Sequence, residues 1–490
     1  MIIQRIYTTA ALLTIWLTLS AQVTTTAEAN PAATSSQAAT PGHAATYTLE
    51  QCIASARQHN RELQNAALDI DAAREQKAEA WTKYFPQVSA NVMAFYAFDK
   101  LIKSDGTYPQ ELAALSAMAP SMGESGAMLA ALGQMAGQPY SISELNRGYS
   151  ATLSAMQPIY AGGQITTGNK LAALQQEVRE MQLRLTEKDI VQKVTENFWQ
   201  IAQLKYNLRT LDAADRQLSA VYKQVENYVK AGVTTRNDLL KVTMRQQELK
   251  SNRLKVNNGI RVLMLLLAQE TGMQQPFDIL LPDEAQPAAP PTKATAADAC
   301  STADATARIE YALALKNIEA QQLQLKMERA KLMPTIAVGV MGYHTGFGGL
   351  SESAKQYAST TMTNGIALAT LSIPISDWWG GTHAIRRQKI AVQQARNNAD
   401  DAREQLAIDN ASAWLNLQEA YEQIGVQKVS VEQAEENLRL ATEQHRAGTE
   451  TITDLLDAET LNRQAKDNLA SAIATYHIRL ADYHRKCDVR

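Results

Sequence analysis

The chain is poor in the residues that interrupt long helices and in the patterns that make catalytic or metal sites. Its 490 residues include only 23 glycines and 14 prolines, which favours long helices over a compact α/β fold. The formal charge of −3 gives no electrostatic reason to expect a nucleic-acid partner. No Ser/His/Asp or glycine-rich phosphate signature occurs, and His477 and His484 have no obvious third metal ligand. We therefore expect neither an enzyme nor a cofactor or metal site.

Cysteines and long apolar runs are scarce as well. The three cysteines, Cys52, Cys300 and Cys487, are consistent with three thiols or with one disulfide and one thiol. Residues 1–29 are predicted to be a secretory signal, with cleavage after residue 21 or 29, because a basic start and a short apolar run precede small residues. Residues 30–46 are predicted to be a disordered linker. Beyond the signal, no run is apolar for long enough to form a membrane-spanning helix, so membrane entry would require a β-barrel.

An internal duplication is the strongest signal in the rest of the sequence. Ala-Gly followed six residues after the glycine by Asp-Leu-Leu occurs at Gly232 and again at Gly448, 216 residues further on. Pro158 and Pro374, each in a strand-like segment, have the same offset. Such self-similarity indicates two copies of one structural plan. The predicted order is a first repeat, an equatorial linker and a second repeat, at 47–275, 276–307 and 308–490.

Each repeat is predicted to contain two strands, a very long helix and a tight turn, which we call its tip. The strands alternate apolar and polar residues over about 9–11 residues, the length of a membrane-spanning strand. The long helices contain no proline, and their apolar residues recur at three- and four-residue spacing. Shorter helices are expected at Leu49–Tyr84 and about Ala307–Leu332. The predicted ranges are strands at 86–98, 148–160, 334–345 and 364–376, long helices at 165–230 and 382–446, and tips at 231–238 and 447–454.

The four predicted strands cannot close a barrel alone, because the smallest barrels need about eight. An open strand edge cannot face lipid, so we expect an oligomer, and three chains would supply twelve strands. The segment 99–146, between the first two predicted strands, has helix-like patches at Gln110–Ala119 and Gly126–Gln134.

These features together resemble the TolC-type outer membrane efflux protein family. The resemblance covers Leu49 to Lys486, and rests on the proline-marked strand entries, the glycine pairs that follow, and the tip sequence Arg446–Ala458. It implies a mainly helical homotrimer, in which a twelve-stranded membrane β-barrel, four strands per chain, continues into a long periplasmic α-helical barrel. It also implies passive efflux through the outer membrane of a diderm bacterium, with a periplasmic adaptor protein and an inner-membrane pump as partners. It places the segment 99–146, in the position of a short outer loop of the family, at the outer mouth, where a surface decoration is expected and a lid or plug is the alternative. A duct for type I protein or peptide secretion and a periplasmic scaffold without a pore are the alternatives.

The resemblance assigns roles only to residues of the tips. Asp454 and Asp457 match the acidic residues that surround the periplasmic aperture in the family, and such a ring would favour cations. Helix N-capping is an equally good interpretation of Asp454, because Asp238 and Asp454 both follow a tip and open a helix.

The second tip departs from the family pattern at His445 and Glu450, two positions where the family locks its closed aperture. A lock of reversed charge, in which Glu450 pairs with Arg236 or Lys241, is one hypothesis, and solvated side chains are the other. The residues of this possible lock are Arg236, Asp238, Lys241, His445 and Glu450. The segments that match the family's adaptor-docking tips are Ala231, Gly232, Val233, Thr234, Ala447, Gly448 and Thr449.

Overall fold

The computed structural model describes most of the chain after residue 44. The chain divides into two units, Met1–Ala45 and Thr46–Arg490, and only the second is considered below. The predicted signal, most of the predicted linker at 30–46, most of 276–307 and Cys300 lie outside the described residues. The described ranges are 45–98, 106–107, 110–118, 126–137, 139–140, 146–281, 305–351, 356–376 and 379–487.

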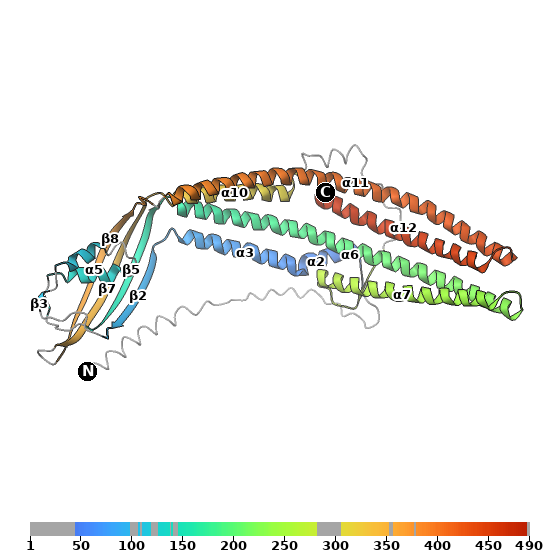
Figure 1. Ribbon diagram of the computed structural model, residues 1–490, viewed down its shortest axis with the longest axis horizontal. Helices are drawn as coiled ribbons and strands as arrows, with labels where there is room; N and C mark the ends of the chain where they lie inside the picture. Colours follow the sequence, from blue (N-terminus) through green and yellow to red (C-terminus); the bar gives the residue numbers. More distant parts are fainter. Residues whose placement is uncertain are drawn as a thin grey trace, which may run out of the picture. The chain divides into compact units, whose positions relative to one another are not determined.

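Two very long helices organise the molecule (Figure 1). They have 67 and 68 residues, so that each is roughly 100 Å long at 1.5 Å per residue. Each turns sharply at its end into a returning helix of 36 residues. The long helices are α6 (Gln164–Lys230) and α11 (Gly380–Ala447), the returning helices are α7 (Arg236–Thr271) and α12 (Ile452–Cys487), and the shorter helices are α2 (Leu49–His59), α3 (Arg61–Thr82) and α10 (Ile309–Ala330).

The helices form four parallel columns with a fixed lateral order. Helix α11 contacts α10 and α12, these two contact α6, and α6 contacts α3 and α7 on its other side. The pairs α10 with α12 and α3 with α7 each share one column. The outer columns of the layer are therefore α11 on one edge and α3 with α7 on the other.

The predicted helix Leu49–Tyr84 is wrong as a single element, because Asn60 divides it into α2 and α3. Asn60 has extended backbone angles, and its side-chain oxygen accepts from the N–H groups of Glu62 and Leu63 at 2.8 and 3.3 Å. Its side-chain nitrogen donates to the carbonyl oxygen of Glu270 at 2.9 Å. Asn60 thus caps α3 and ties the break to the end of α7.

A cluster of buried side chains joins α2, α6, α7 and α12 near the middle of the columns. Trp199 stacks on His477, with ring centroids 3.7 Å apart and planes 3° from parallel. Burial lowers the pKa of His477 to about 4, so that its imidazole is neutral at physiological pH. Cys487, at the end of α12, is disulfide-bonded, whereas Cys52 is a buried free thiol.

Four antiparallel strands form one sheet in the order β2-β5-β7-β8. Strand β2 directly follows α3, and β8 leads into α11, so the sheet and the helical layer share the same two edges. Among the described residues, no helix is long and apolar enough to cross a membrane. The strands are β2 (Gln87–Tyr96), β5 (Arg147–Ala161), β7 (Thr335–Ser351) and β8 (Gln356–Ser372).

The two faces of this sheet differ in chemistry, because alternate residues of a strand point to opposite faces. The strand register places apolar, exposed side chains on one face, which we call the apolar face: Val88, Val92, Leu153, Val340 and Leu371. The opposite, polar face carries Ser89, Asn91, Ser150, Thr152, Ser154, Tyr343, Thr345 and Asn364. Across this polar face, the hydroxyl oxygens of Ser89 and Ser154 are 2.8 Å apart.

An insert between β2 and β5 folds into two short helices on a two-stranded base. The base pairs β3 (Gly106–Thr107) with β4 (Pro139–Tyr140), and the helices α4 (Leu112–Met118) and α5 (Gly126–Gln134) pack on each other. The helices lie close together because Gly133 has no side chain, and a Cβ atom there would meet Ser116 at 2.4 Å. The helix-like patches expected from the sequence coincide with these two helices.

Candidate functional site at the helical tips

Both tips turn the chain on a glycine with left-handed backbone angles. Gly232 has φ of 71° and Gly448 has φ of 75°, a conformation that side chains with a Cβ atom rarely adopt. At each tip an N–H group just past the helix closes the turn: Val233 donates to the carbonyl oxygen of Tyr228, and Thr449 to that of Gln444. The glycines are therefore explained by the turn itself.

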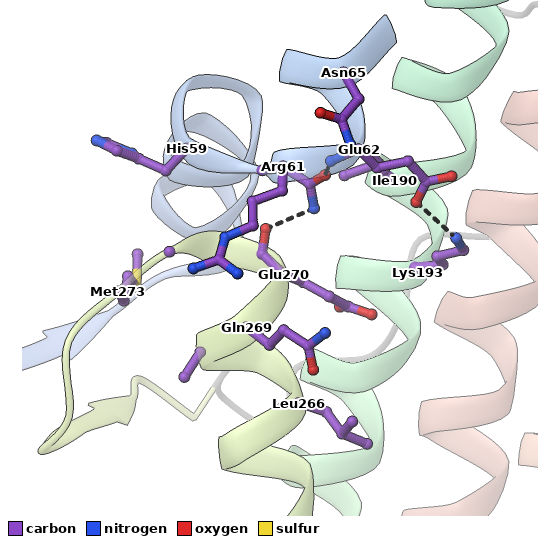
Figure 2. A pocket seen from close by; sticks show the side chains of 13 residues that line it. His59, Arg61, Glu62, Asn65, Ile190, Lys193, Leu266, Gln269, Glu270 and Met273 are labelled. Carbon is purple, nitrogen blue, oxygen red and sulfur yellow. Dashed lines mark hydrogen bonds and ion pairs between the residues drawn. The ribbon is translucent and has the colours of Figure 1, made fainter.

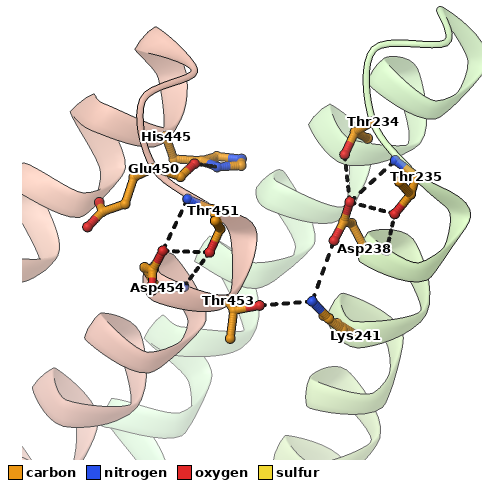
Figure 3. Close-up of polar contacts among 9 residues, drawn as sticks. All are labelled: Thr234, Thr235, Asp238, Lys241, His445, Glu450, Thr451, Thr453 and Asp454. Carbon is orange, nitrogen blue, oxygen red and sulfur yellow. Dashed lines mark hydrogen bonds and ion pairs between the residues drawn. The ribbon is translucent and has the colours of Figure 1, made fainter.

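At the first tip, Asp238 forms a reciprocal capping box with Thr235 (Figure 3). The Asp238 N–H donates to the Thr235 hydroxyl at 3.3 Å, and the Asp238 carboxylate accepts from the Thr235 N–H at 3.3 Å. The carboxylate also accepts from the hydroxyls of Thr235 and Thr234 at 2.7 and 2.8 Å. These donors, the Thr235 hydroxyl foremost, hold the pKa of Asp238 below its usual value.

At the second tip, Asp454 forms the same box with Thr451. Its carboxylate accepts from the Thr451 N–H and hydroxyl at 3.2 and 2.5 Å, and its own N–H donates to the Thr451 hydroxyl at 3.3 Å. Asp454 therefore helps to cap α12 from the N3 position, with Thr451 in the N-cap position. Asp457, one turn further on, is exposed, as Asp454 is, so the two carboxylates are accessible at the end of the α11–α12 hairpin.

The contact that joins the two tips is different from the predicted one. Lys241 donates to the Thr453 hydroxyl at 2.9 Å, and its ammonium group lies 3.6 Å from the Asp238 carboxylate. The carboxylate of Glu450 points away from Lys241 (Figure 3), and its Oε2 atom is buried without a hydrogen-bond partner among the described residues. Within one chain, the structure thus pairs Lys241 with Thr453 and not with Glu450.

The other two residues of the possible lock also have separate positions. The Nδ1 atom of His445 donates to the carbonyl oxygen of Glu450 at 3.3 Å, which closes the second tip locally. Arg236, at the start of α7, is exposed. The predicted lock residues are therefore gathered at one end of the hairpins, and the structure brings only Asp238 and Lys241 together as charges.

A buried carboxylate behind the tips escaped the sequence analysis. Glu459 is 5% exposed, and one of its oxygens lies 3.9 Å from the Arg245 guanidinium of α7. Burial raises the pKa of Glu459, and the positive charges of Arg245 and Arg463 lower it in part. The sequence did carry a signal, because Glu459 continues the buried helix face of Leu455 and Leu456.

A cavity of about 760 Å³ lies on the edge column, where α3 meets α7 (Figure 2). Its wall carries charges of both signs, and Lys193 donates to Glu62 across it at 3.3 Å. Burial raises the pKa of Glu270, although Asn197 donates to its carboxylate at 2.7 Å. The mixed charge identifies no ligand class, and the cavity is the space between two helices stacked end to end.

Comparison with known proteins agrees with this architecture. Residues 311–482, which lie in the second half of the chain, match the family model described as "Outer membrane efflux protein". The fold of the chain is that of the TolC-type outer membrane channels. The family and the structural relatives are channels and not enzymes. Among curated proteins, no sequence matches the chain.

The structural similarity extends over almost the whole chain, although sequence identity is low. CusC, described in terms of transmembrane channel formation, is 16% identical with a TM-score of 0.68, covering 90% of this chain and 91% of that one. The outer membrane protein VceC of Vibrio cholerae is 14% identical, with a TM-score of 0.65 and coverage of 90% and 95%. The CmeC outer membrane channel of Campylobacter jejuni is 12% identical, with a TM-score of 0.66 and coverage of 90% and 85%. At these identities the similarity establishes the fold alone.

Proposed function

We propose that three copies of this chain form a duct through the outer membrane, which continues into the periplasm as a tube of helices and exports substrates passively. The observation that supports this most strongly is that the sheet and the helical layer end at the same two edges of the chain. Strands β2 and β8 are the two ends of the sheet, and both leave backbone groups unpaired, which lipid does not tolerate. A head-to-tail contact between β2 of one chain and β8 of the next removes every such edge if the ring closes.

The outer helical columns support the same contact. Each presents a stripe of exposed apolar side chains, which a single chain in water would leave unfavourably hydrated. On α11 the stripe includes Ile390, Ile408, Leu415 and Val426, and on α3 and α7 it includes Leu68, Met244, Leu254 and Leu265. Packing α11 against the α3–α7 column of the next chain would bury both stripes. The same contact between chains would pair β8 with β2.

The four-column unit is also consistent with two copies of one plan. The paired long helices and returning helices have nearly equal lengths, and the capping boxes of Asp238 and Asp454 are 216 residues apart. We infer that residues 47–275 and 308–490 are the two repeats. Their tips, at 231–238 and 447–454, would dock a periplasmic adaptor protein, through which an inner-membrane pump supplies the substrate.

The aperture at the tips is proposed to carry the carboxylates of Asp454 and Asp457. Both are exposed at the end of the second hairpin, and three chains would bring six of them together. A ring of this charge favours cations. Because the Asp454 carboxylate also accepts the capping-box bonds of Thr451, its replacement changes the helix and the charge together, whereas replacement of Asp457 changes the charge without removing a capping bond.

The test is the conductance and ion selectivity of the purified oligomer in planar bilayers. We expect cation-selective steps from the wild type and a loss of selectivity in Asp457→Ala, whereas Asp400→Ala, which removes an exposed carboxylate of α11 well away from the tips, serves as the matched control. Steps of unchanged selectivity in Asp457→Ala would keep the duct and remove the aperture assignment. No steps from a folded oligomer would instead favour a scaffold without a pore.

A further inference from the structure

The α4–α5 hairpin lies on the polar face of the sheet. At the end of α5, the Gln134 side-chain oxygen accepts from the Tyr343 hydroxyl at 2.6 Å and from the Asn364 side chain at 3.2 Å. Tyr343 on β7 and Asn364 on β8 are register partners. Gln134 therefore fastens the hairpin to two neighbouring strands at once.

A small apolar cluster, on which the hairpin packs, interrupts this polar face. Met135 packs with Phe347 of β7 and Phe95 of β2, and both Met135 and Phe347 are buried. The two phenylalanines pair with Gly148 of β5 from opposite sides. A Cβ atom at Gly148 would lie 2.6 Å from the Phe95 ring and 2.9 Å from the Phe347 ring. The glycine thus lets both rings lean over β5 and meet under Met135.

The opposite, apolar face is the one that suits lipid. Val92 is 80% exposed, Val340 60% and Leu153 59%, and the described part of the hairpin packs on the other face. In a closed barrel of this sheet, the apolar face must point outward to the membrane. The hairpin then lies on the inside of the barrel wall.

We propose that the α4–α5 hairpin is a plug within the outer half of the barrel, an inference that rests on the proposed trimeric duct. Twelve strands spaced by ~4.8 Å and tilted by ~40° give a ring roughly 24 Å across. Each helix is about 10 Å thick, so three hairpins occupy most of that cross-section. The duct would therefore be restricted at its outer end as well as at the tips, and the hairpins must move aside before a bulky substrate leaves. The proposal therefore adopts the plug, which the sequence analysis gave as the alternative, in place of the surface decoration that it favoured.

The test is reagent access to the polar face from outside the cell. In a Cys52→Ser background, Ser154→Cys places a thiol on the polar face and Leu153→Cys places one on the apolar face next to it. A bulky, membrane-impermeant maleimide is added to cells, and labelling rates are compared between the intact chain and a chain in which 112–137 is replaced by a short Gly-Ser linker. We expect deletion to accelerate labelling of Ser154→Cys at least about tenfold, because it removes the hairpin together with the buried Met135 side chain and the two hydrogen bonds of Gln134 that hold it on the sheet. The Leu153→Cys variant should stay unlabelled in both.

A second variant keeps the chain length in case the deletion does not fold. Gln134→Ala/Met135→Ser removes the two contacts but leaves the hairpin, and should also accelerate labelling of Ser154→Cys. Fast, equal labelling of Ser154→Cys with and without these changes overturns the plug and leaves the duct intact. Labelling of Leu153→Cys as fast as Ser154→Cys means that the apolar face does not meet lipid, and overturns the proposed duct itself.

Discussion

The two tips share a capping box but differ in the number of bonds that hold it. Asp238 accepts from the hydroxyls of both Thr234 and Thr235, whereas Asp454 accepts a hydroxyl only from Thr451. Loss of a capping interaction at a helix N-terminus costs about 1 kcal/mol, which corresponds to roughly a fivefold change in an equilibrium constant. We therefore expect Asp454→Ala to raise the local opening of its tip about fivefold. For Asp238→Ala we expect roughly ten- to thirtyfold, because one more bond to a charged group is lost.

Hydrogen exchange of the assembled protein at pH 7 measures this difference directly. The informative peptides cover residues 228–241 and 444–457, and each variant should affect its own tip alone. Asp238→Asn and Asp454→Asn are the matched controls, because asparagine keeps a capping oxygen and should leave exchange near the wild-type rate. Equal protection loss in the two alanine variants, or a greater loss in Asp454→Ala, would refute the reasoning from bond number.

The first tip should also respond to acid. Because the Thr235 and Thr234 hydroxyls hold the pKa of Asp238 below its usual value, the folded tip binds this proton more weakly than the unfolded chain. The stabilisation is then present above the unfolded pKa, about 3.9, and is lost as the pH falls through the lower folded value. Exchange at this tip should rise below about pH 4, and less so in Asp238→Asn.

Three further predictions concern the columns and tips. Burial raises the pKa of Glu459, so the wild type loses stability as the pH rises from about 4.3 through the folded pKa. Glu459→Gln carries no charge at this position and should therefore raise the melting temperature at pH 7. Melts from pH 4 to 8 should show this gap narrowing on acidification, and a widening gap would contradict it. Burial lowers the pKa of His477 to about 4, so stability falls between pH 6.5 and 4 by up to about 3 kcal/mol. His477→Gln should flatten this part of the melting profile, and an unchanged slope would count against it. Finally, Lys241→Cys/Thr453→Cys should cross-link within a chain on oxidation, as seen by gel mobility, whereas Lys241→Cys/Glu450→Cys should not. The opposite result would restore the predicted lock.

The mainly helical, TolC-type fold could be predicted because its signals are local. Absence of proline and a three- to four-residue apolar period specify a helix without reference to the rest of the chain. The break at Asn60 had a local signal too, since Asn60 followed by Glu62 is typical of a helix start, but the helical pattern on both sides concealed it. The partner of Asn60, the Glu270 carbonyl group, comes from the far end of another helix and could not be predicted.

The remaining features depend on which surfaces meet. The composition of the 99–146 insert indicates helices, but only the strand register and the Gln134 contacts identify the face on which they lie. Similarly, Lys241 could have approached any of several polar side chains of the second tip, and its bond to Thr453 depends on the relative height of two hairpins. The spacing of residues in the sequence determines their positions within one helix or strand. It does not determine how far one element is shifted along another.

The shared edges of the sheet and the helical layer have a consequence for assembly. Strand β2 and α3 lie at one edge, and β8 and α11 at the other. A single chain therefore exposes an unpaired strand and an apolar helix surface on each of its two sides. Contacts of this head-to-tail kind give a closed ring or an endless fibre, depending only on the rotation between successive copies. For the proposed ring, the angle at this interface, which is the same in the sheet and in the helical layer, decides whether growth stops at a defined number of subunits.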